Sequence, residues 1–199
     1  MGQYPVIFMS LKDVSGDSYE EIVGQLREAV CQSTKIHRSL FRNSDCLGET
    51  ERAILHSYQE GCASEEHLRN YLSKYTQWLN DVTGCQSVIL LDEYDVPLQK
   101  AAIYDMHHPQ SELFDKTVKL IGGFISSGFK SNSNLAYGII AECLRVAKEA
   151  IFTGMNNPGV ITVIDEIPDE FWGFTQIEVE KMLDYYDLSD KMGALKHWY

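Results

Sequence analysis

The sequence predicts an α/β fold of three layers, in which helices flank a mainly parallel sheet. Short aliphatic runs alternate along the chain with segments whose apolar residues recur at helical spacing. The run Val88–Leu91 has four consecutive large aliphatic residues, which is typical of a parallel strand buried on both faces. Ser18 and Thr175 each stand three positions before a Glu, a pattern that marks the start of a helix. No repeat or linker interrupts the pattern, so we expect a single domain over residues 1–199.

The first half of the chain is expected to hold one strand and three helices. The strand covers Pro5–Leu11, and the first helix follows Ser18. A second helix is expected over residues 49–60. A third begins after Ser64 and ends at Gly84. Its apolar residues recur on one face, which is typical of packing against a core, and they are Leu68, Tyr71, Leu72, Tyr75 and Leu79.

The second half repeats the alternation. After the strand at 88–91, Pro97 is expected to close the segment, and a helix is expected over residues 111–129. The remaining elements are strands at Leu135–Ala141 and Val160–Ile164, a helix after Thr175 with Val179, Met182 and Leu183 facing inward, and a short helix from Ser189 to Trp198.

Composition excludes several classes of function. The chain has 17 basic and 29 acidic residues and a net charge of -12, which argues against direct binding of nucleic acid. Its five cysteines include no pair at CxxC spacing, so we expect reduced thiols and no zinc ribbon. No apolar stretch is long enough to span a membrane, and the N-terminus lacks the pattern of a signal peptide. We therefore expect a cytoplasmic protein without a membrane partner.

The residues with the clearest chemistry follow the predicted strand at 88–91. There Asp92-Glu93-Tyr94-Asp95 places three carboxylates within four positions, where ligands of open α/β sheets bind. Aliphatic residues followed by Asp-Glu form a Walker-B-type pattern, in which Asp92 holds Mg²⁺ and Glu93 orients the water that attacks a phosphate. Asp95 is a second candidate metal ligand, because Mg²⁺ prefers carboxylate oxygens. The alternative is a solvated acidic turn.

Four stretches of the chain resemble the AAA-ATPase-like family of bacterial proteins. They are YPVIFMSLKDVSGDSYEEI, VILLDEYDVPLQKA, LRVAKEAIFTGMNN and FWGFTQIEVEKMLDYYDL, in the order in which the family has them. The resemblance implies a P-loop NTPase-like fold that uses ATP and Mg²⁺. It also implies a nucleotide as partner, and a protein partner or a C-terminal nuclease-like domain in the full-length protein.

Two features depart from the family. No GxxxxGK[ST] occurs, so the Walker A loop that cradles phosphate is missing; in the family it precedes the segment matching Tyr4–Val6. We therefore expect a domain that is incomplete at its N-terminus, either a fragment or a naturally shortened relative. In addition, Ala141-Glu142 stands where the family has Thr-Gly, which removes a polar side chain and adds a negative charge near the expected phosphate site.

Arg145, just beyond a strand end, is a further candidate for catalysis and nucleotide binding, because a guanidinium can bind phosphate with two hydrogen bonds. An ion pair with Asp92, Asp95 or Glu142 is the alternative. Asp13 either faces the same crevice as Asp92 or is a turn residue. His107 and His108 are expected in a flexible loop ending at Pro109 rather than in a metal site.

Three functions remain open on this basis. The first is an ATPase-like domain that binds nucleotide and Mg²⁺ and is not autonomously catalytic. The second is a degenerate, non-catalytic scaffold for binding or regulation, which the two departures favour. The third is a metal-dependent phosphodiesterase or nuclease using Asp92, Glu93 and Asp95, but such sites usually place a Lys near a strand-borne acid, and none occurs there.

Overall fold

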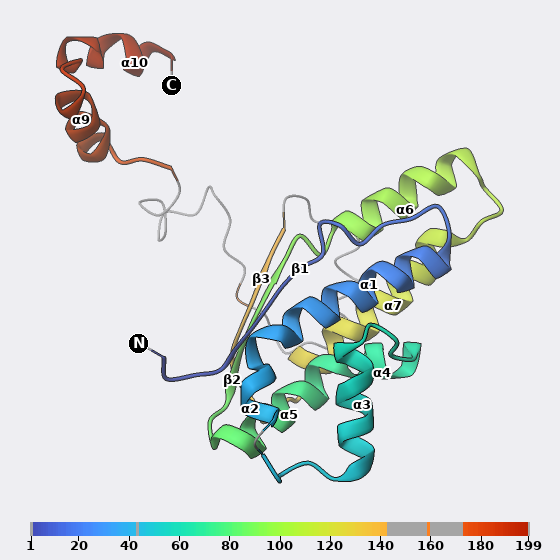
Figure 1. The fold of residues 1–199 in the computed structure, drawn as a ribbon. Helices are drawn as coiled ribbons and strands as arrows, with labels where there is room; N and C mark the ends of the chain where they lie inside the picture. Colours follow the sequence, from blue (N-terminus) through green and yellow to red (C-terminus); the bar gives the residue numbers. More distant parts are fainter. Residues whose placement is uncertain (1, 43, 143–158, 160–172, 199) are drawn as a thin grey trace. The chain divides into compact units, whose positions relative to one another are not determined.

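The chain divides into two compact units, residues 1–156 and residues 157–199. The computed structural model describes residues 2–42, 44–142, 159 and 173–198 (Figure 1). The first unit contains a sheet with its helices, and the described part of the second contains helices alone. The assignment of both to one domain over residues 1–199 stays a prediction.

Three parallel strands form the sheet of the first unit in the order β1-β2-β3. They are β1 (Val6–Ser10), β2 (Ser87–Asp92) and β3 (Leu135–Ala141). The sequence analysis predicted all three, and the bounds of β3 agree with its prediction. The predicted fourth strand, at 160–164, lies outside the described residues.

The strand register places three residues side by side at the carboxyl ends of the strands. Ser10 pairs with Asp92, and Asp92 pairs with Ala141. The backbone ladder continues past the strands, because Leu11 N–H donates to the Asp92 carbonyl at 2.9 Å and Glu93 N–H donates to the Ala141 carbonyl at 3.1 Å. We call this end of the sheet the carboxyl edge.

The helices between β1 and β2 follow the predicted pattern with two differences, of which the first is that η1 and α2, at residues 35–42, were not predicted. They are α1 (Tyr19–Thr34), the 3-10 turn η1 (Lys35–His37), α2 (Arg38–Arg42), α3 (Glu49–Gln59), α4 (Glu65–Arg69) and α5 (Tyr71–Thr83). The single helix predicted after Ser64 is divided at Asn70 into α4 and α5. Its predicted apolar face is nevertheless fully buried, and Gly84 ends α5 with a left-handed φ of 70°.

Two helices lie between β2 and β3, α6 (Val96–His107) and α7 (Leu113–Phe129). The sequence analysis predicted α7 but expected Pro97 to close a segment and His107 to lie in a loop. Pro97 instead occupies the first turn of α6, where its missing N–H removes no helical hydrogen bond. His107 is the last residue of that helix.

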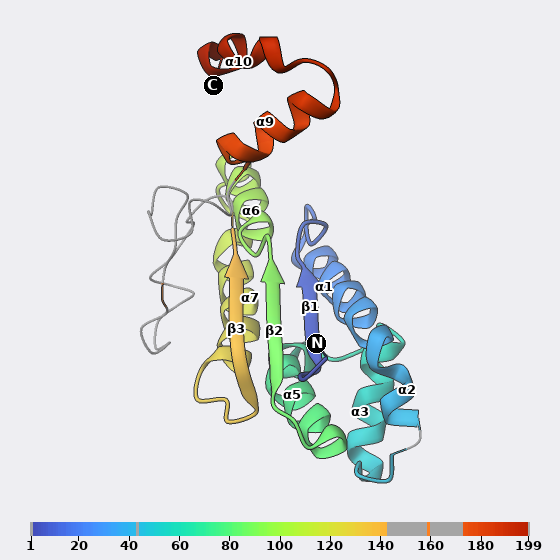
Figure 2. The ribbon, with the colours of Figure 1, turned by 90° about the vertical axis from the view of Figure 1, so that its left-hand side faces the viewer.

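Helices cover one face of the sheet. Figure 2 shows the three strands in front of α1, α5 and α7, and these helices contact β1, β2 and β3 respectively. The opposite face, which we call the bare face, carries exposed apolar side chains, including Phe8 (50% exposed) and Ile139 (58%). The expectation that β2 is buried on both faces is therefore wrong for the part of this unit that the structure describes, and the predicted third layer does not occur within it.

The covered face continues into a core rich in aromatic residues. Tyr71 stacks on Tyr75 and on Phe124 of α7, and its hydroxyl lies 2.6 Å from the Ser33 hydroxyl of α1. Trp78 is also buried. Burying side chains of this size contributes about 1.5–3 kcal/mol each to the stability of the fold. Because Tyr71, Tyr75 and Trp78 all belong to α5, this helix is central to the core.

The described part of the second unit consists of α9 (Gln176–Tyr185), the 3-10 turn η3 (Ser189–Lys191) and α10 (Met192–Trp198). The predicted capping box is confirmed, because Thr175 and Glu178 exchange hydrogen bonds at the start of α9. Of the residues predicted to face inward, Leu183 is buried, Val179 is half-buried and Met182 is exposed. No helix in the described residues is both long and apolar enough to span a membrane.

We predict opposite effects from two Gly→Ala substitutions. A Cβ at Gly128 of α7 would lie 2.6 Å from Leu72 Cβ of α5, whereas a Cβ at Gly24 of α1 would meet no atom within 4 Å. Gly128→Ala is expected to lower the free energy of unfolding by about 1–2 kcal/mol, because the two helices must separate. Gly24→Ala is expected to raise it by about 0.5–1 kcal/mol, since alanine favours helix. Denaturant unfolding of both variants checks this, and stabilisation by Gly128→Ala would contradict the close contact.

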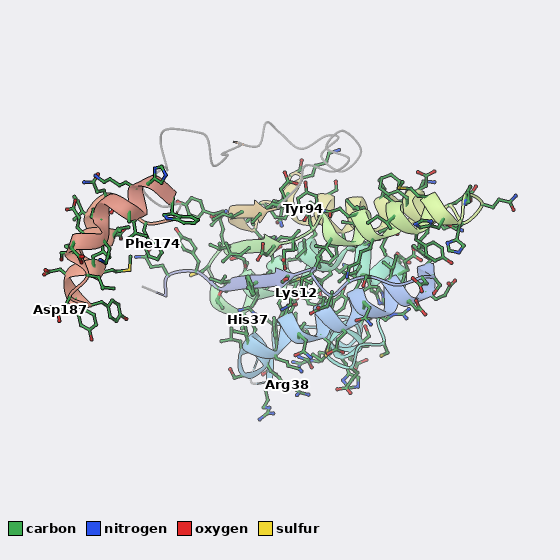
Figure 3. All side chains as sticks on the ribbon, turned by 90° about the horizontal axis from the view of Figure 1, so that it is seen from above. Lys12, His37, Arg38, Tyr94, Phe174 and Asp187 are labelled. Atoms are coloured by element: carbon green, nitrogen blue, oxygen red, sulfur yellow. The ribbon has the colours of Figure 1, made fainter. Side chains whose placement is uncertain are left out.

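We also predict that His37 makes the fold sensitive to acid. His37 is buried against Tyr75, whose hydroxyl lies 3.4 Å from Nδ1 (Figure 3). Burial lowers the pKa of His37 below its ordinary value of 6.5. As the pH falls through about 6.5, the unfolded chain binds a proton that the folded protein does not bind, so the free energy of unfolding decreases. Denaturant unfolding between pH 7.5 and 5 is expected to show a weaker pH dependence for His37→Gln, with His107→Gln on the exposed end of α6 as control.

Candidate functional site

Asp92 lies at the centre of the carboxyl edge. It is the last residue of β2 and is flanked in the register by Ser10 of β1 and Ala141 of β3. The alternation of side chains along β2 places Asp92 on the bare face with Val88 and Leu90. Its side chain is half-buried, so a ligand at this edge can reach its carboxylate.

Glu93 is held in an unusual backbone conformation next to Asp92. Its φ of 55° lies in the left-handed region, which residues with a Cβ atom adopt only rarely. Its carboxylate accepts a hydrogen bond from the Ser10 hydroxyl at 2.9 Å, and that hydroxyl in turn accepts from the Lys12 N–H at 3.3 Å. The Glu93 side chain is therefore fixed to the end of β1 and to the loop that follows it.

The sequence analysis did not identify Ser10 as a site residue. Ser10 lies 83 positions from Glu93, and only the parallel pairing of β1 with β2 brings the two together. A polar residue at the end of the first predicted strand was the one available signal. Asp13, which was considered instead, is exposed in the loop after β1, where Figure 3 labels the preceding residue, Lys12.

Tyr94 connects the site to the end of β3. Its side chain is buried, and its hydroxyl donates a hydrogen bond to the carboxylate of Glu142, the residue after β3 (Figure 3). Glu142 was expected to add a negative charge near the phosphate site. In the structure this carboxylate is bound by a tyrosine hydroxyl, and the bond holds the segment after β2 against the segment after β3.

Asp95 differs from Asp92 in its surroundings. Its side chain is completely buried at the start of α6, where the Gln99 amide donates to its carboxylate at 2.5 Å. Gln99 N–H also donates to the Asp95 carbonyl at 2.9 Å. Of the two predicted metal ligands, Asp92 is therefore the less buried.

A divalent metal at the carboxyl edge would have few protein ligands. Within the described residues no group of three or more His, Cys, Asp or Glu side chains is arranged to hold an ion. Mg²⁺ does not require such a group, since it commonly binds one or two protein carboxylates and completes its shell with water and phosphate oxygens. Asp92 fits that role. Arg145 lies outside the described residues, and the His108 ring stacks on Tyr104 instead of joining the acidic residues.

These features define an α/β protein that presents carboxylates at the carboxyl edge of a parallel sheet, and they are compatible with a P-loop-like fold. The model of the AAA-ATPase-like family, described as a predicted AAA-ATPase, matches residues 1–152. The chain therefore belongs to the AAA-ATPase-like family, as the resemblance in its sequence implied. No curated protein and no solved structure matches the chain.

We predict that the conformation of Glu93 lowers the stability of the fold. Glu93→Gly and Glu93→Ala both remove the hydrogen bond from Ser10, but only glycine adopts a φ of 55° without a steric penalty. The free energy of unfolding is therefore expected to be about 1 kcal/mol higher for Glu93→Gly than for Glu93→Ala. Urea unfolding of the pair measures this difference. Equal stability would show that the left-handed conformation carries no strain.

Proposed function

We propose that the chain is an ATPase-like domain that binds ATP together with Mg²⁺ at its carboxyl edge, and that it is not autonomously catalytic. The observation that carries this proposal is the half-exposed Asp92 at the end of a central parallel strand, followed by Glu93. Membership of the AAA-ATPase-like family supports the same conclusion. Ligands of open α/β sheets bind at this edge, where the strands end.

The residues of the acidic turn have separate roles in the proposal. Asp92 holds Mg²⁺, and Glu93 orients a water molecule towards the terminal phosphate, with its carboxylate kept in place by Ser10. Bound Mg²⁺ neutralises charge on the phosphate oxygens. Arg145 contacts phosphate, and Asp95 acts as a further metal ligand only if it leaves its buried position beside Gln99.

A second candidate function is supported by Glu142. A domain that binds partners without hydrolysing nucleotide does not need a polar residue at the position of Ala141. The Glu142 carboxylate, next to Ala141, accepts a hydrogen bond from the Tyr94 hydroxyl. Both features suit a non-catalytic scaffold. Such a scaffold would belong to a cytoplasmic assembly and have a protein or a nuclease-like domain as its partner.

We predict that binding of Mg²⁺-ATP depends on Asp92. Isothermal titration of the chain with ATP is expected to show binding that requires Mg²⁺, and Asp92→Asn is expected to weaken it about tenfold or more, because a carboxylate on the metal is lost. Asp81→Asn, an exposed acid on α5, is the matched control and should bind as the wild type does. Absence of Mg²⁺-dependent binding by the wild type, or equal binding by Asp92→Asn, contradicts the proposal.

Hydrolysis tests whether the chain is catalytic on its own. With ATP bound, we expect no release of phosphate by the wild type. Release that Glu93→Gln abolishes and Ser10→Ala reduces would contradict this and assign an ATPase activity to the carboxyl edge. A scaffold needs no ATP, so Mg²⁺-dependent binding of ATP, and not its hydrolysis, separates the two candidate functions. The two variants keep Asp92 unchanged, so their affinity for ATP tests whether the site is still intact.

A further inference from the structure

A cavity of about 460 Å³ lies among α1, α4, α6 and α7. This volume is within the range of sites that bind small molecules. The residues that line it include none from the acidic turn or from the ends of the strands. The cavity is therefore a separate feature from the proposed nucleotide site.

The charges around the cavity are divided between two elements. Asp17 and Glu20, at the start of α1, contribute carboxylates, and Lys116 and Lys119, on neighbouring turns of α7, contribute ammonium groups. Among the described residues none of these four side chains lies within ion-pair distance of an opposite charge. Carboxylates and ammonium groups that line one cavity without contacting each other leave both kinds of charge available to a ligand.

A second pair of charges in the lining behaves differently. Glu65 and Arg69 of α4 form an ion pair at 2.5 Å, so their charges neutralise each other. The stem of Arg69 also packs near Gly123 of α7, which fixes its position. The available charges of the cavity are therefore those of α1 and α7.

Lys116 is placed against the helix dipole. It lies in the first turn of α7, where the positive end of the dipole disfavours cations, and Lys119 follows in the second turn. The Asp105 carboxylate accepts hydrogen bonds from the N–H groups of Leu113 and Phe114 and so caps the start of this helix. Glu112 and Asp115 stand four positions before Lys116 and Lys119, but among the described residues neither pair lies within ion-pair distance. An anionic group in the cavity would therefore interact favourably with both lysines.

Between the two charged walls the lining is aromatic and apolar. Tyr19, Tyr104 and Leu113 contribute to it, and Leu113 is buried. Burial and the neighbouring Glu65 raise the pKa of Tyr19, whose hydroxyl lies beside the Glu65–Arg69 ion pair. Such a lining accommodates the apolar body of a ligand that carries opposite charges at its ends.

We propose that this cavity binds a small zwitterion whose ammonium and carboxylate groups are separated by an apolar body, as in a short peptide with free ends. The ammonium group contacts Asp17 and Glu20, and the carboxylate contacts Lys116 and Lys119. The apolar body lies against Tyr19 and Tyr104.

The probe is the tripeptide Gly-Phe-Gly, added to the ¹⁵N-labelled full chain and followed by two-dimensional NMR. Saturable shifts of the amides of Tyr19, Lys116 and Lys119 are expected. The N-acetylated peptide lacks the cation and the C-amidated peptide lacks the anion, and each is expected to bind about twofold to fivefold more weakly, as for other exposed charge pairs. No saturable shift at these residues, or equal binding of the three peptides, would overturn the proposal.

Substitutions test which side chains contact each charged end of the peptide. Lys116→Gln with Lys119→Gln is expected to weaken binding of Gly-Phe-Gly and to remove the advantage of the free carboxylate over the amide, whereas Lys130→Gln, beyond the far end of α7, should change neither. Asp17→Asn with Glu20→Gln should remove the advantage of the free ammonium over the acetylated form, with Glu66→Gln on α4 as control. Asp92→Asn should leave peptide binding unchanged, because the two sites share no residue. Loss of peptide binding in Asp92→Asn, or an unchanged preference in the lysine pair, contradicts the assignment.

Discussion

The parallel pairing of β2 with β1 on one side and β3 on the other determines where Ser10, Asp92 and Glu93 of the proposed nucleotide site lie. Because Ser10, Asp92 and Ala141 occupy one row of the register, the segments after the three strands begin side by side. The backbone bonds of Leu11 and Glu93 extend the same ladder beyond the strands. A shift of one residue in this register would turn Asp92 towards the helices and separate Ser10 from Glu93. The geometry of the site is thus a consequence of sheet register more than of the acidic residues themselves.

The distribution of helices explains why Asp92 is accessible. In the described residues of the first unit, α1, α5 and α7 pack on the face that carries Ile89 and Leu91, while Asp92 belongs to the bare face. Parallel sheets are usually covered on both faces, and the sequence of β2, with four aliphatic residues in succession, is of that kind. The bare face therefore combines apolar side chains with a carboxylate at its end. A phosphate-bearing ligand at the carboxyl edge would meet Asp92 from this face.

Much of the fold could be predicted because its signals are local. Aliphatic runs marked all three strands, and Ser18, Ser64 and Thr175 cap helices as expected. Local patterns were less decisive at Asn70, where α4 ends and α5 begins, and at Pro97, since proline both stops a helix and begins one. The contacts within the site could not be predicted, because they join positions far apart in the sequence. Ser10 and Glu93 are 83 positions apart and Tyr94 and Glu142 are 48, and only the order of the strands brings them together.

In the sequence Asp92-Glu93-Tyr94-Asp95 is one acidic group, but in the structure its four residues have four different surroundings. Asp92 faces the bare side of the sheet, Glu93 is bound to β1 through Ser10, Tyr94 is bound to the end of β3 through Glu142, and Asp95 is buried at the start of α6. Repulsion between the carboxylates is reduced because the hydrogen bonds of Glu93 and Asp95 direct their side chains to different elements. In this arrangement Glu93 has a left-handed backbone conformation, which glycine would adopt at a lower energetic cost. A non-glycine residue in the left-handed conformation at the end of a central strand is consistent with the role that we propose for the Glu93 carboxylate at the carboxyl edge.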